Sequence, residues 1–304
     1  MSIRRRTFIK AAGASGLALG LGGFSAAGSS RVEDVQARLR DIETRFGGTL
    51  GAEILDLGSG AAVGHNRDER FGHASSFKLS LAALLLARHA AGEIDADQHV
   101  RWDESDMMRP DTFTRPHLET GASLRDLARA TQTTSDNPAA NILLRELGGP
   151  AALTAFWRSI GDEVSRLDRN EPSVNLVPPG EIRDTTTPAA MARTVAQLVY
   201  GTALPQAERA MLKQWMVDTG TGRRRVRAGL PDGWLAGDKT GTGLTPQTGG
   251  TYIDIGFVEP PETSPLVFAA YYRPAGADNS FDRAHEAPLK QVGVVLADFA
   301  RMQR

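Results

Sequence analysis

Strand-forming segments lie near both ends of the chain, and helix-forming segments fill the part between them. The strand-like segments occupy residues 50–57, 61–64, 234–239, 251–258 and 266–273. Residues 75–218 carry mostly helical patterns, and further helices are expected at 32–46 and 287–302. Because strands from both ends must meet in one sheet, we expect an α/β fold of the α+β type, an antiparallel sheet flanked by helices with an inserted all-helical lobe.

The same pattern predicts how the lobes divide the chain. Residues 28–68 and 220–304 are expected to form the α/β lobe and residues 69–219 the helical lobe, with an active site in the cleft between them. Residues 162–186 show neither a helical nor a strand period. That stretch is too long for an ordinary connection, and long loops of this kind are usually functional.

The N-terminus reads as an export signal rather than as part of the fold. Residues 4–10 read Arg-Arg-Arg-Thr-Phe-Ile-Lys, a weakly apolar stretch follows to Phe24, and Ser25-Ala26-Ala27 offers a small-residue cleavage site. This resembles a twin-arginine signal, so residues 1–27 are expected to be a signal peptide and the mature protein to be periplasmic. The alternative, a membrane anchor, is disfavoured because the apolar run is shorter than the ~20 residues that span a bilayer.

Composition excludes several classes of protein. The chain has no cysteine, so disulfide scaffolds, thiol nucleophiles and thiolate metal sites are ruled out. Lys and Arg number 35 against 36 Asp and Glu, which leaves no basic field for nucleic acid. The six histidines lack metal-binding spacing, and no dinucleotide or phosphate-binding loop occurs. We therefore expect no metal, cofactor or nucleic-acid partner. The protein is also expected to be a monomer, with no stable membrane association after cleavage of the signal.

Short polar motifs carry the candidate chemistry. Ser75 and Lys78 lie three residues apart at the start of an apolar helix, so the amine can reach the hydroxyl and act as its base. The other motifs are Ser135-Asp136-Asn137 before a helix, Glu171 with Asn175 in the long loop, and Lys239-Thr240-Gly241 at the end of a strand. Each motif alone also fits an ordinary helix cap, a turn or a solvated loop.

The order and spacing of these motifs are far more specific than any one of them. Together they resemble the class A serine β-lactamases, and the resemblance runs from about Val32 to the end of the chain. It implies a β-lactamase/transpeptidase-like fold and a serine hydrolase that opens the β-lactam amide bond through an acyl-enzyme, conferring resistance. The glutamate of the long loop separates this family from penicillin-binding proteins, which share the Ser and Lys motifs.

The resemblance also implies catalytic roles for individual residues. Ser75 is the acylated nucleophile, and Lys78 is its proton partner. Ser135 passes a proton to the leaving lactam nitrogen. Glu171, with Asn175, positions and activates the hydrolytic water. Whether Lys78 or Glu171 removes the proton of the serine is left open.

Substrate contacts follow from the same resemblance. Asn137 is expected to hold the side-chain amide of the substrate, and Lys239, Thr240 and Gly241 to lie along its carboxylate. The backbone N–H groups of Ser75 and Thr242 form the oxyanion hole. Arg225 stands where other members supply a second cation for the carboxylate, and an Arg169–Asp184 ion pair is expected to join the ends of the long loop.

This chain also departs from the family pattern. Pro110 occupies the position of an aromatic gate residue, for which Phe113 or Met108 are candidate replacements, and Asn170 replaces a frequent Trp. Two alternative functions stay open from sequence. One is a D,D-peptidase or penicillin-binding protein, and the other is a non-catalytic β-lactam sensor that stays acylated.

Overall fold

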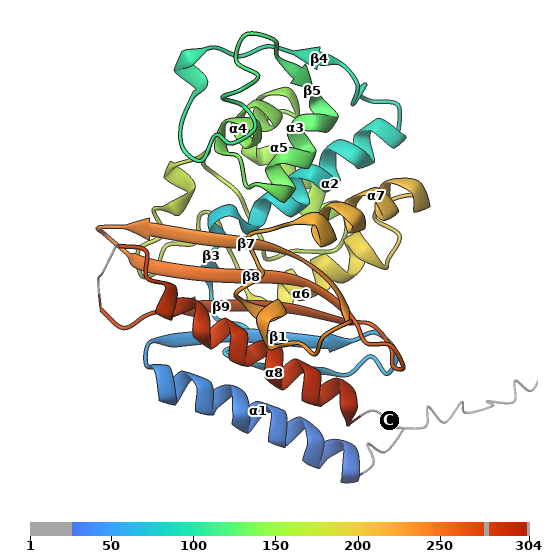
Figure 1. Cartoon of the computed structure of the whole chain (residues 1–304), viewed down its shortest axis with the longest axis vertical. Helices are drawn as coiled ribbons and strands as arrows, with labels where there is room; N and C mark the ends of the chain where they lie inside the picture. Colours follow the sequence, from blue (N-terminus) through green and yellow to red (C-terminus); the bar gives the residue numbers. More distant parts are fainter. Residues whose placement is uncertain (1–25, 277–279, 303–304) are drawn as a thin grey trace, which may run out of the picture.

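The molecule is built around one antiparallel sheet of five strands, whose order is β2-β1-β9-β8-β7 (Figure 1). The computed structural model describes residues 26–276 and 280–302. The strands are β1 (Thr49–Asp56), β2 (Ala62–His65), β7 (Leu235–Thr245), β8 (Gly249–Glu259) and β9 (Leu266–Arg273). The N-terminal hairpin thus joins strands from the other end of the chain, and the predicted antiparallel sheet is confirmed.

Helices cover both faces of this sheet. Helices α1 (Ala26–Phe46) and α8 (Ala287–Arg301) lie side by side on one face, and α6 (Pro188–Val199) packs on the other (Figure 1). Alternate residues of one strand therefore enter different cores: Phe268 of β9 faces α1 and α8, whereas Val267 joins the core of the helical part. Burial on both faces explains why β9 reads as a continuous apolar run.

The remaining helices form the upper part of the molecule in Figure 1. They are α2 (Phe77–Ala90), α3 (Leu124–Thr133), α4 (Asn137–Glu146), α5 (Gly149–Ser159) and α7 (Gln206–Asp218). Every residue of α2 from Phe77 to Leu86 is buried, so α2 is the central helix of this core. The turn that immediately precedes α2, Ala74–Ser76, lies against β7 and β8 of the sheet.

Polar side chains cap the starts of three helices. The Ser123 hydroxyl accepts a hydrogen bond from the Asp126 N–H at 3.0 Å at the start of α3. The Thr187 hydroxyl caps α6 in the same way, accepting from the Ala190 N–H at 3.2 Å. In the Ser-Asp-Asn motif the cap is Asp136, which accepts from the Ala139 N–H at 3.0 Å. Local side-chain chemistry therefore fixes the helix starts.

The strand predicted to end at Lys239 instead continues to Thr245. Lys239 pairs with Ile255, Thr242 with Tyr252 and Thr245 with Gly249, so the turn of this hairpin lies beyond the motif. Two short strand pairs were also absent from the prediction: β3 (Phe71–Gly72) with β6 (Thr185–Thr186), and β4 (His99–Val100) with β5 (Ala122–Ser123). The pairing partner, which is remote in sequence, decides these elements.

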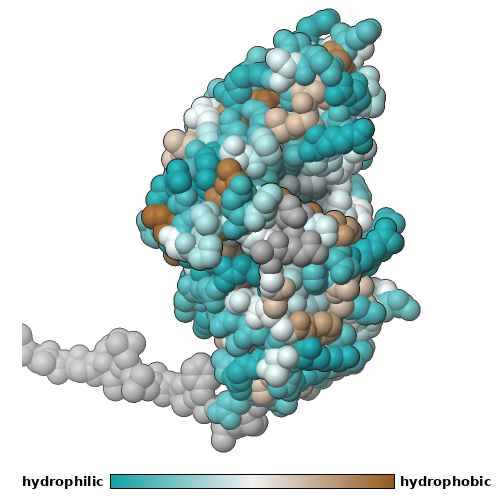
Figure 2. Space-filling model, turned by 90° about the vertical axis from the view of Figure 1, so that its left-hand side faces the viewer, coloured by the Kyte–Doolittle hydropathy of each residue, from teal (hydrophilic) through white to brown (hydrophobic). Residues whose placement is uncertain are grey.

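The N-terminal signal mostly lies outside the described residues, because the structure describes the chain only from Ala26. In residues 26–276 and 280–302, no helix combines the length and apolar character needed to cross a bilayer. Figure 2 shows one face of the molecule as mostly hydrophilic, with hydrophobic residues in small separate spots. This face therefore offers no broad apolar surface for a partner.

Candidate active site

Ser75 lies in a tight turn just before helix α2, rather than in the helix itself as the sequence predicts. The turn is a 3-10 helix, Ala74–Ser76, and Ala74 takes a φ of 39°. The Ser76 hydroxyl donates to the His73 carbonyl at 2.8 Å, which closes the turn from inside. Ser75 is the half-buried member, and its Oγ donates to Glu171 Oε1 at 3.3 Å.

Lys78 lies one turn further along and is fully buried. Its Nζ donates to the Ser135 carbonyl at 3.0 Å and to Asn137 Oδ1 at 2.5 Å, and it lies 3.2 Å from Glu171 Oε1. Burial lowers the pKa of Lys78, and the neighbouring Glu171 carboxylate opposes that shift. Ser75 and Lys78 thus meet through one oxygen of Glu171, so both can exchange a proton with it.

The Ser-Asp-Asn motif enters from the turn between α3 and α4. Ser135 has a φ of 61°, a left-handed conformation that is costly for a residue with a side chain. Asp136 is fully buried and accepts from the Phe113 and Thr114 N–H groups at 2.8 and 3.1 Å. The motif is thereby fixed to the preceding loop, and such strain is typical of functional sites.

The long loop brings Glu171 against Ser75 and holds it there. Oε2 of Glu171 accepts from Asn175 Nδ2 at 3.0 Å, as the motif requires. The side-chain amide of Asn141 binds both backbone polar groups of Glu171. The Glu171 N–H donates to Asn141 Oδ1 at 3.0 Å, and the Glu171 carbonyl accepts from Asn141 Nδ2 at 2.9 Å. The predicted Arg169–Asp184 ion pair is confirmed at the ends of the loop.

Asn141 is the functional residue that the sequence analysis missed. It lies on α4 one helical turn after Asn137, so both amides share a face of that helix. The i,i+4 spacing from the Ser-Asp-Asn motif is the signal that could have identified it. Of the candidate replacements for the gate, Met108 lies near this amide, with its sulfur 3.7 Å from Asn141 Nδ2, whereas Phe113 stacks on His117.

Strand β7 forms the wall of the site opposite the long loop that carries Glu171. The fully buried Lys239 donates to Ser135 Oγ at 3.0 Å, and its pKa is lowered well below the usual value, first by burial and then by the charge of Lys78. Gly241 is needed for close approach, since a Cβ there would lie 2.9 Å from the His73 carbonyl oxygen. The absence of that side chain lets β7 lie directly beside the turn of Ser75.

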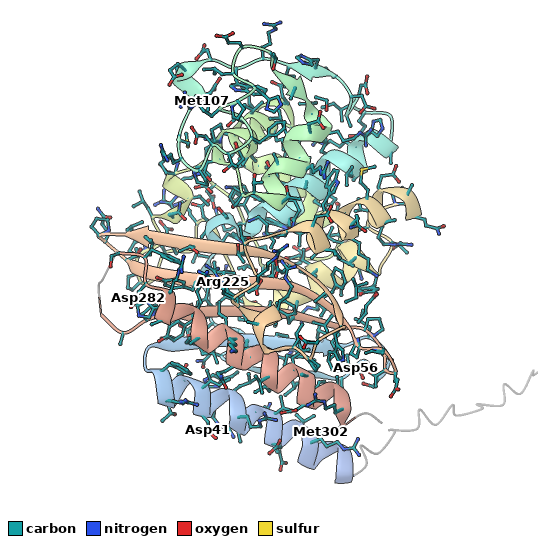
Figure 3. The ribbon with its side chains drawn as sticks, in the orientation of Figure 1. Asp41, Asp56, Met107, Arg225, Asp282 and Met302 are labelled. Carbon is teal, nitrogen blue, oxygen red and sulfur yellow. The ribbon has the colours of Figure 1, made fainter. Side chains whose placement is uncertain are left out.

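Residues of the loop that follows α7 form hydrogen bonds with the hydroxyl groups of Thr240 and Thr242. Thr240 Oγ1 donates to Thr221 Oγ1 at 2.7 Å, and Arg225 donates to Thr242 Oγ1 at 2.6 Å. Arg225 lies among the strands beneath this edge (Figure 3) and is 3% exposed. Its other donors bind Glu286 and the carbonyls of Gly241 and Ile253.

These contacts correct one expectation. Arg225 is predicted from sequence to offer its cation to the substrate carboxylate, but its guanidinium is buried and four of its five N–H donors are already engaged. It reaches the site through the Thr242 hydroxyl. The residues predicted from sequence are otherwise gathered in one place: Ser75, Lys78, Ser135, Asn137, Glu171, Asn175, Lys239, Thr240, Gly241 and Thr242.

This arrangement has the components of covalent hydrolysis. A hydroxyl nucleophile and a buried amine contact the same carboxylate, and a second buried amine contacts the neighbouring Ser135, which is the pattern of an activated serine. Among the described residues, no group of His, Cys, Asp or Glu is arranged to hold a metal ion.

Comparison with known proteins gives consistent matches. Residues 34–297 match a family model described as the β-lactamase enzyme family. β-Lactamase FAR-1 of Nocardia farcinica is 49% identical over 68% of this chain and 66% of its own length. The carbapenem-hydrolysing β-lactamase KPC of Klebsiella oxytoca is 39% identical over 95% of this chain and 94% of its own. A solved ancestral class A β-lactamase has a TM-score of 0.81 and 44% identity, covering 87% of this chain and 99% of its own.

Proposed function

The chain belongs to the class A β-lactamases and hydrolyses the β-lactam amide bond, which confers resistance to β-lactams, and we propose that it does so through an ester on Ser75. The observation that carries this proposal is the position of Glu171. Its carboxylate contacts the nucleophile, the buried Lys78 and Asn175 at once. One group is therefore placed to serve both the formation and the hydrolysis of the ester.

Acylation begins when Ser75 Oγ attacks the lactam carbonyl carbon. Its proton passes to the Glu171–Lys78 pair, and the lowered pKa of Lys78 makes the neutral amine accessible as a base. The backbone N–H groups of Ser75 and Thr242 stabilise the oxyanion. As the carbon–nitrogen bond breaks, Ser135 donates its proton to the leaving nitrogen, and the proton taken from Ser75 is returned to Ser135 through Lys78. Lys239 Nζ, 3.0 Å from Ser135 Oγ, donates a hydrogen bond to that oxygen and so stabilises the negative charge that develops on it.

Substrate is held along two walls of the site. Asn137 has one N–H engaged with the Arg109 carbonyl at 2.7 Å, which leaves its second N–H for the side-chain amide of the substrate. On the other wall, Lys239, Thr240, Gly241 and Thr242 receive the carboxylate. Arg225 supports this wall by fixing the Thr242 hydroxyl from behind.

Deacylation needs a water molecule beside the ester. Glu171 removes the proton of that water, which Asn175 helps to orient, as the water oxygen attacks the ester carbon. The bond from that carbon to Ser75 Oγ then breaks, and Glu171 returns the proton to Ser75 Oγ. Asn175 Oδ1 is buried without a hydrogen-bond donor among the described residues. This unpaired acceptor, four residues after Glu171, supports a water-binding role for Asn175.

A turnover count tests the proposed mechanism against its alternatives. We expect one molecule of the purified protein to hydrolyse many molecules of the chromogenic cephalosporin nitrocefin, since the ester is released by water. A D,D-peptidase or a β-lactam sensor would consume about one equivalent and stay acylated. A single stoichiometric burst would exclude the role proposed for Glu171.

We further propose that the protein reaches the periplasm through the twin-arginine route. The support is the sequence around Arg5 and Arg6, with its weakly apolar continuation. Replacing both arginines by lysine should abolish periplasmic β-lactamase activity while leaving activity in the cytoplasm. Unchanged periplasmic activity in the double variant would show that export uses another route.

A further inference from the structure

Gln132 is a buried polar side chain at the end of α3 that the proposed mechanism leaves unused. It is fully buried, and its Nε2 donates to the Asp238 carbonyl on β7 at 2.8 Å and to Thr219 Oγ1, just after α7, at 2.9 Å. A carbonyl can only accept, and the Thr219 hydroxyl gives its own proton to the Trp215 carbonyl at 2.9 Å. These contacts fix the orientation of the amide, with its nitrogen toward β7.

The oxygen of the same amide is left without a partner. Gln132 Oε1 is buried, and no group in residues 26–276 or 280–302 donates a hydrogen bond to it. A buried unpaired oxygen costs free energy that an apolar side chain of similar length would avoid. What Gln132 supplies is a donor for β7, the edge strand of the sheet, where carbonyls on the free side find no strand partner. The contribution of this amide therefore lies in holding β7.

Both ends of this hydrogen bond adjoin residues of the site. Gln132 precedes Ser135 by three residues, and Asp238 immediately precedes Lys239. Lys239 Nζ donates to Ser135 Oγ at 3.0 Å, so the two segments meet a second time within the site. Ser135 has a φ of 61°, a conformation that persists only where the surroundings impose it. The Gln132–Asp238 bond thus joins the same two segments as the Ser135–Lys239 contact.

We propose that Gln132 is a positioning residue for protonation of the leaving lactam nitrogen. It holds β7 against the turn that carries Ser135, at the separation at which Lys239 reaches Ser135 Oγ. The inference rests on the proposed mechanism, in which that oxygen gives its proton to the nitrogen as the carbon–nitrogen bond breaks and regains one through Lys78. Without the Gln132 amide, the buried Asp238 carbonyl loses its donor and β7 is freer to move away from α3.

Two substrates that differ in their leaving group isolate this step. Benzylpenicillin and the ester of phenylacetylglycine with 3-hydroxybenzoic acid share the phenylacetylamino group, and both carry a carboxylate. Attack by Ser75 on the lactam releases an amine nitrogen, which must gain a proton. Attack on the ester releases a phenoxide, which leaves without a proton because the pKa of a phenol is only about 10. A fault in proton delivery therefore slows the lactam more than the ester.

The measured quantity is the ratio of kcat/KM for benzylpenicillin to kcat/KM for the ester, since kcat/KM reports the steps up to acylation. Gln132→Met keeps the length of the side chain and removes both donor contacts. A lost hydrogen bond changes an equilibrium about three- to tenfold, so we expect this variant to lower the ratio about tenfold. A general disturbance of the site would slow both substrates alike and leave the ratio unchanged.

Two further variants serve as a control and as a second test. Thr131 precedes Gln132 on α3, is fully buried, and its hydroxyl has no partner in the part of the chain that the structure describes. Thr131→Val keeps its shape and should leave the ratio unchanged. Thr219→Val removes one of the two acceptors of Gln132 and should lower the ratio about threefold. It decides the question alone if Gln132→Met does not fold.

The outcomes separate this inference from the proposed function. If the wild type hydrolyses benzylpenicillin but the ratio is the same in Gln132→Met and Thr219→Val, Gln132 does not position the proton donor and the proposed site stands. A ratio that falls equally in Thr131→Val would also overturn the inference, because any change at the end of α3 would then suffice. If the wild type turns over neither substrate, the proposed function itself fails.

Discussion

The Glu171→Ala variant should form the ester on Ser75 and then stop. Its missing carboxylate is the group that contacts both the nucleophile and Asn175, so no base remains for the hydrolytic water. General base catalysis contributes about 10²–10⁴-fold, and deacylation should slow by that factor. Mass spectrometry of the variant mixed with benzylpenicillin should show one stable acyl group on Ser75, while the wild type shows none at steady state.

Glu181→Ala is a matched control for this experiment. It removes the same group from the same loop, but Glu181 pairs with Arg183 and lies outside the set of residues around Ser75; among the described residues, its only link to the ion pair at the loop ends is a distance of 4.0 Å to Arg169. Its deacylation should stay close to that of the wild type. If Glu171 only stiffens the loop, its variant should instead lose stability, with acylation and deacylation falling together. Rapid turnover by Glu171→Ala without a trapped adduct would contradict the proposed mechanism.

The fold was predictable where local chemistry decides it. Capping at Ser123 and Thr187 fixes two helix starts from residues that are close in sequence. The order of strands and helices also predicted that the ends of the chain share one sheet. The length of β7 was not predictable in this way, because its last residues extend the strand only by pairing with Gly249–Thr251 of β8.

The candidate site shows the same division. The motif residues were found because their spacing is specific, and the structure brings them into contact. Asn141 was missed because its partner, the backbone of Glu171, is remote in sequence and leaves no side-chain pattern. Arg225 was assigned a direct role because the sequence does not reveal burial: only the fold places Glu286 and two carbonyls around its guanidinium.

The end of the long loop contains a second strongly constrained residue. Asp184 is fully buried and has a φ of 58°. Its Oδ1 accepts from the N–H groups of Asp168 and Arg169 at 2.7 and 2.9 Å, and its other oxygen forms the ion pair with Arg169. Its own carbonyl accepts from the His73 N–H at 2.9 Å. Asp184 thus connects both ends of the loop to the turn that carries Ser75.

Asp184→Ala should therefore cost both stability and deacylation. Removing one partner of a buried ion pair costs about 3–5 kcal/mol, so the free energy of unfolding in chemical denaturation should fall by about 3 kcal/mol, the lower value because Arg169 is partly exposed. Asp184→Asn separates charge from shape, since an amide oxygen still accepts from the two N–H groups and Asn tolerates a positive φ. The free energy of unfolding of the asparagine variant should fall by less than half as much.

Since the loop carries Glu171 to the ester, the deacylation rate should fall in the same order, more in the alanine variant than in the asparagine variant. Equal stability of all three proteins would show that the ion pair does not hold the loop, and an unstable alanine variant with wild-type deacylation would show that Glu171 is positioned by Asn141 alone.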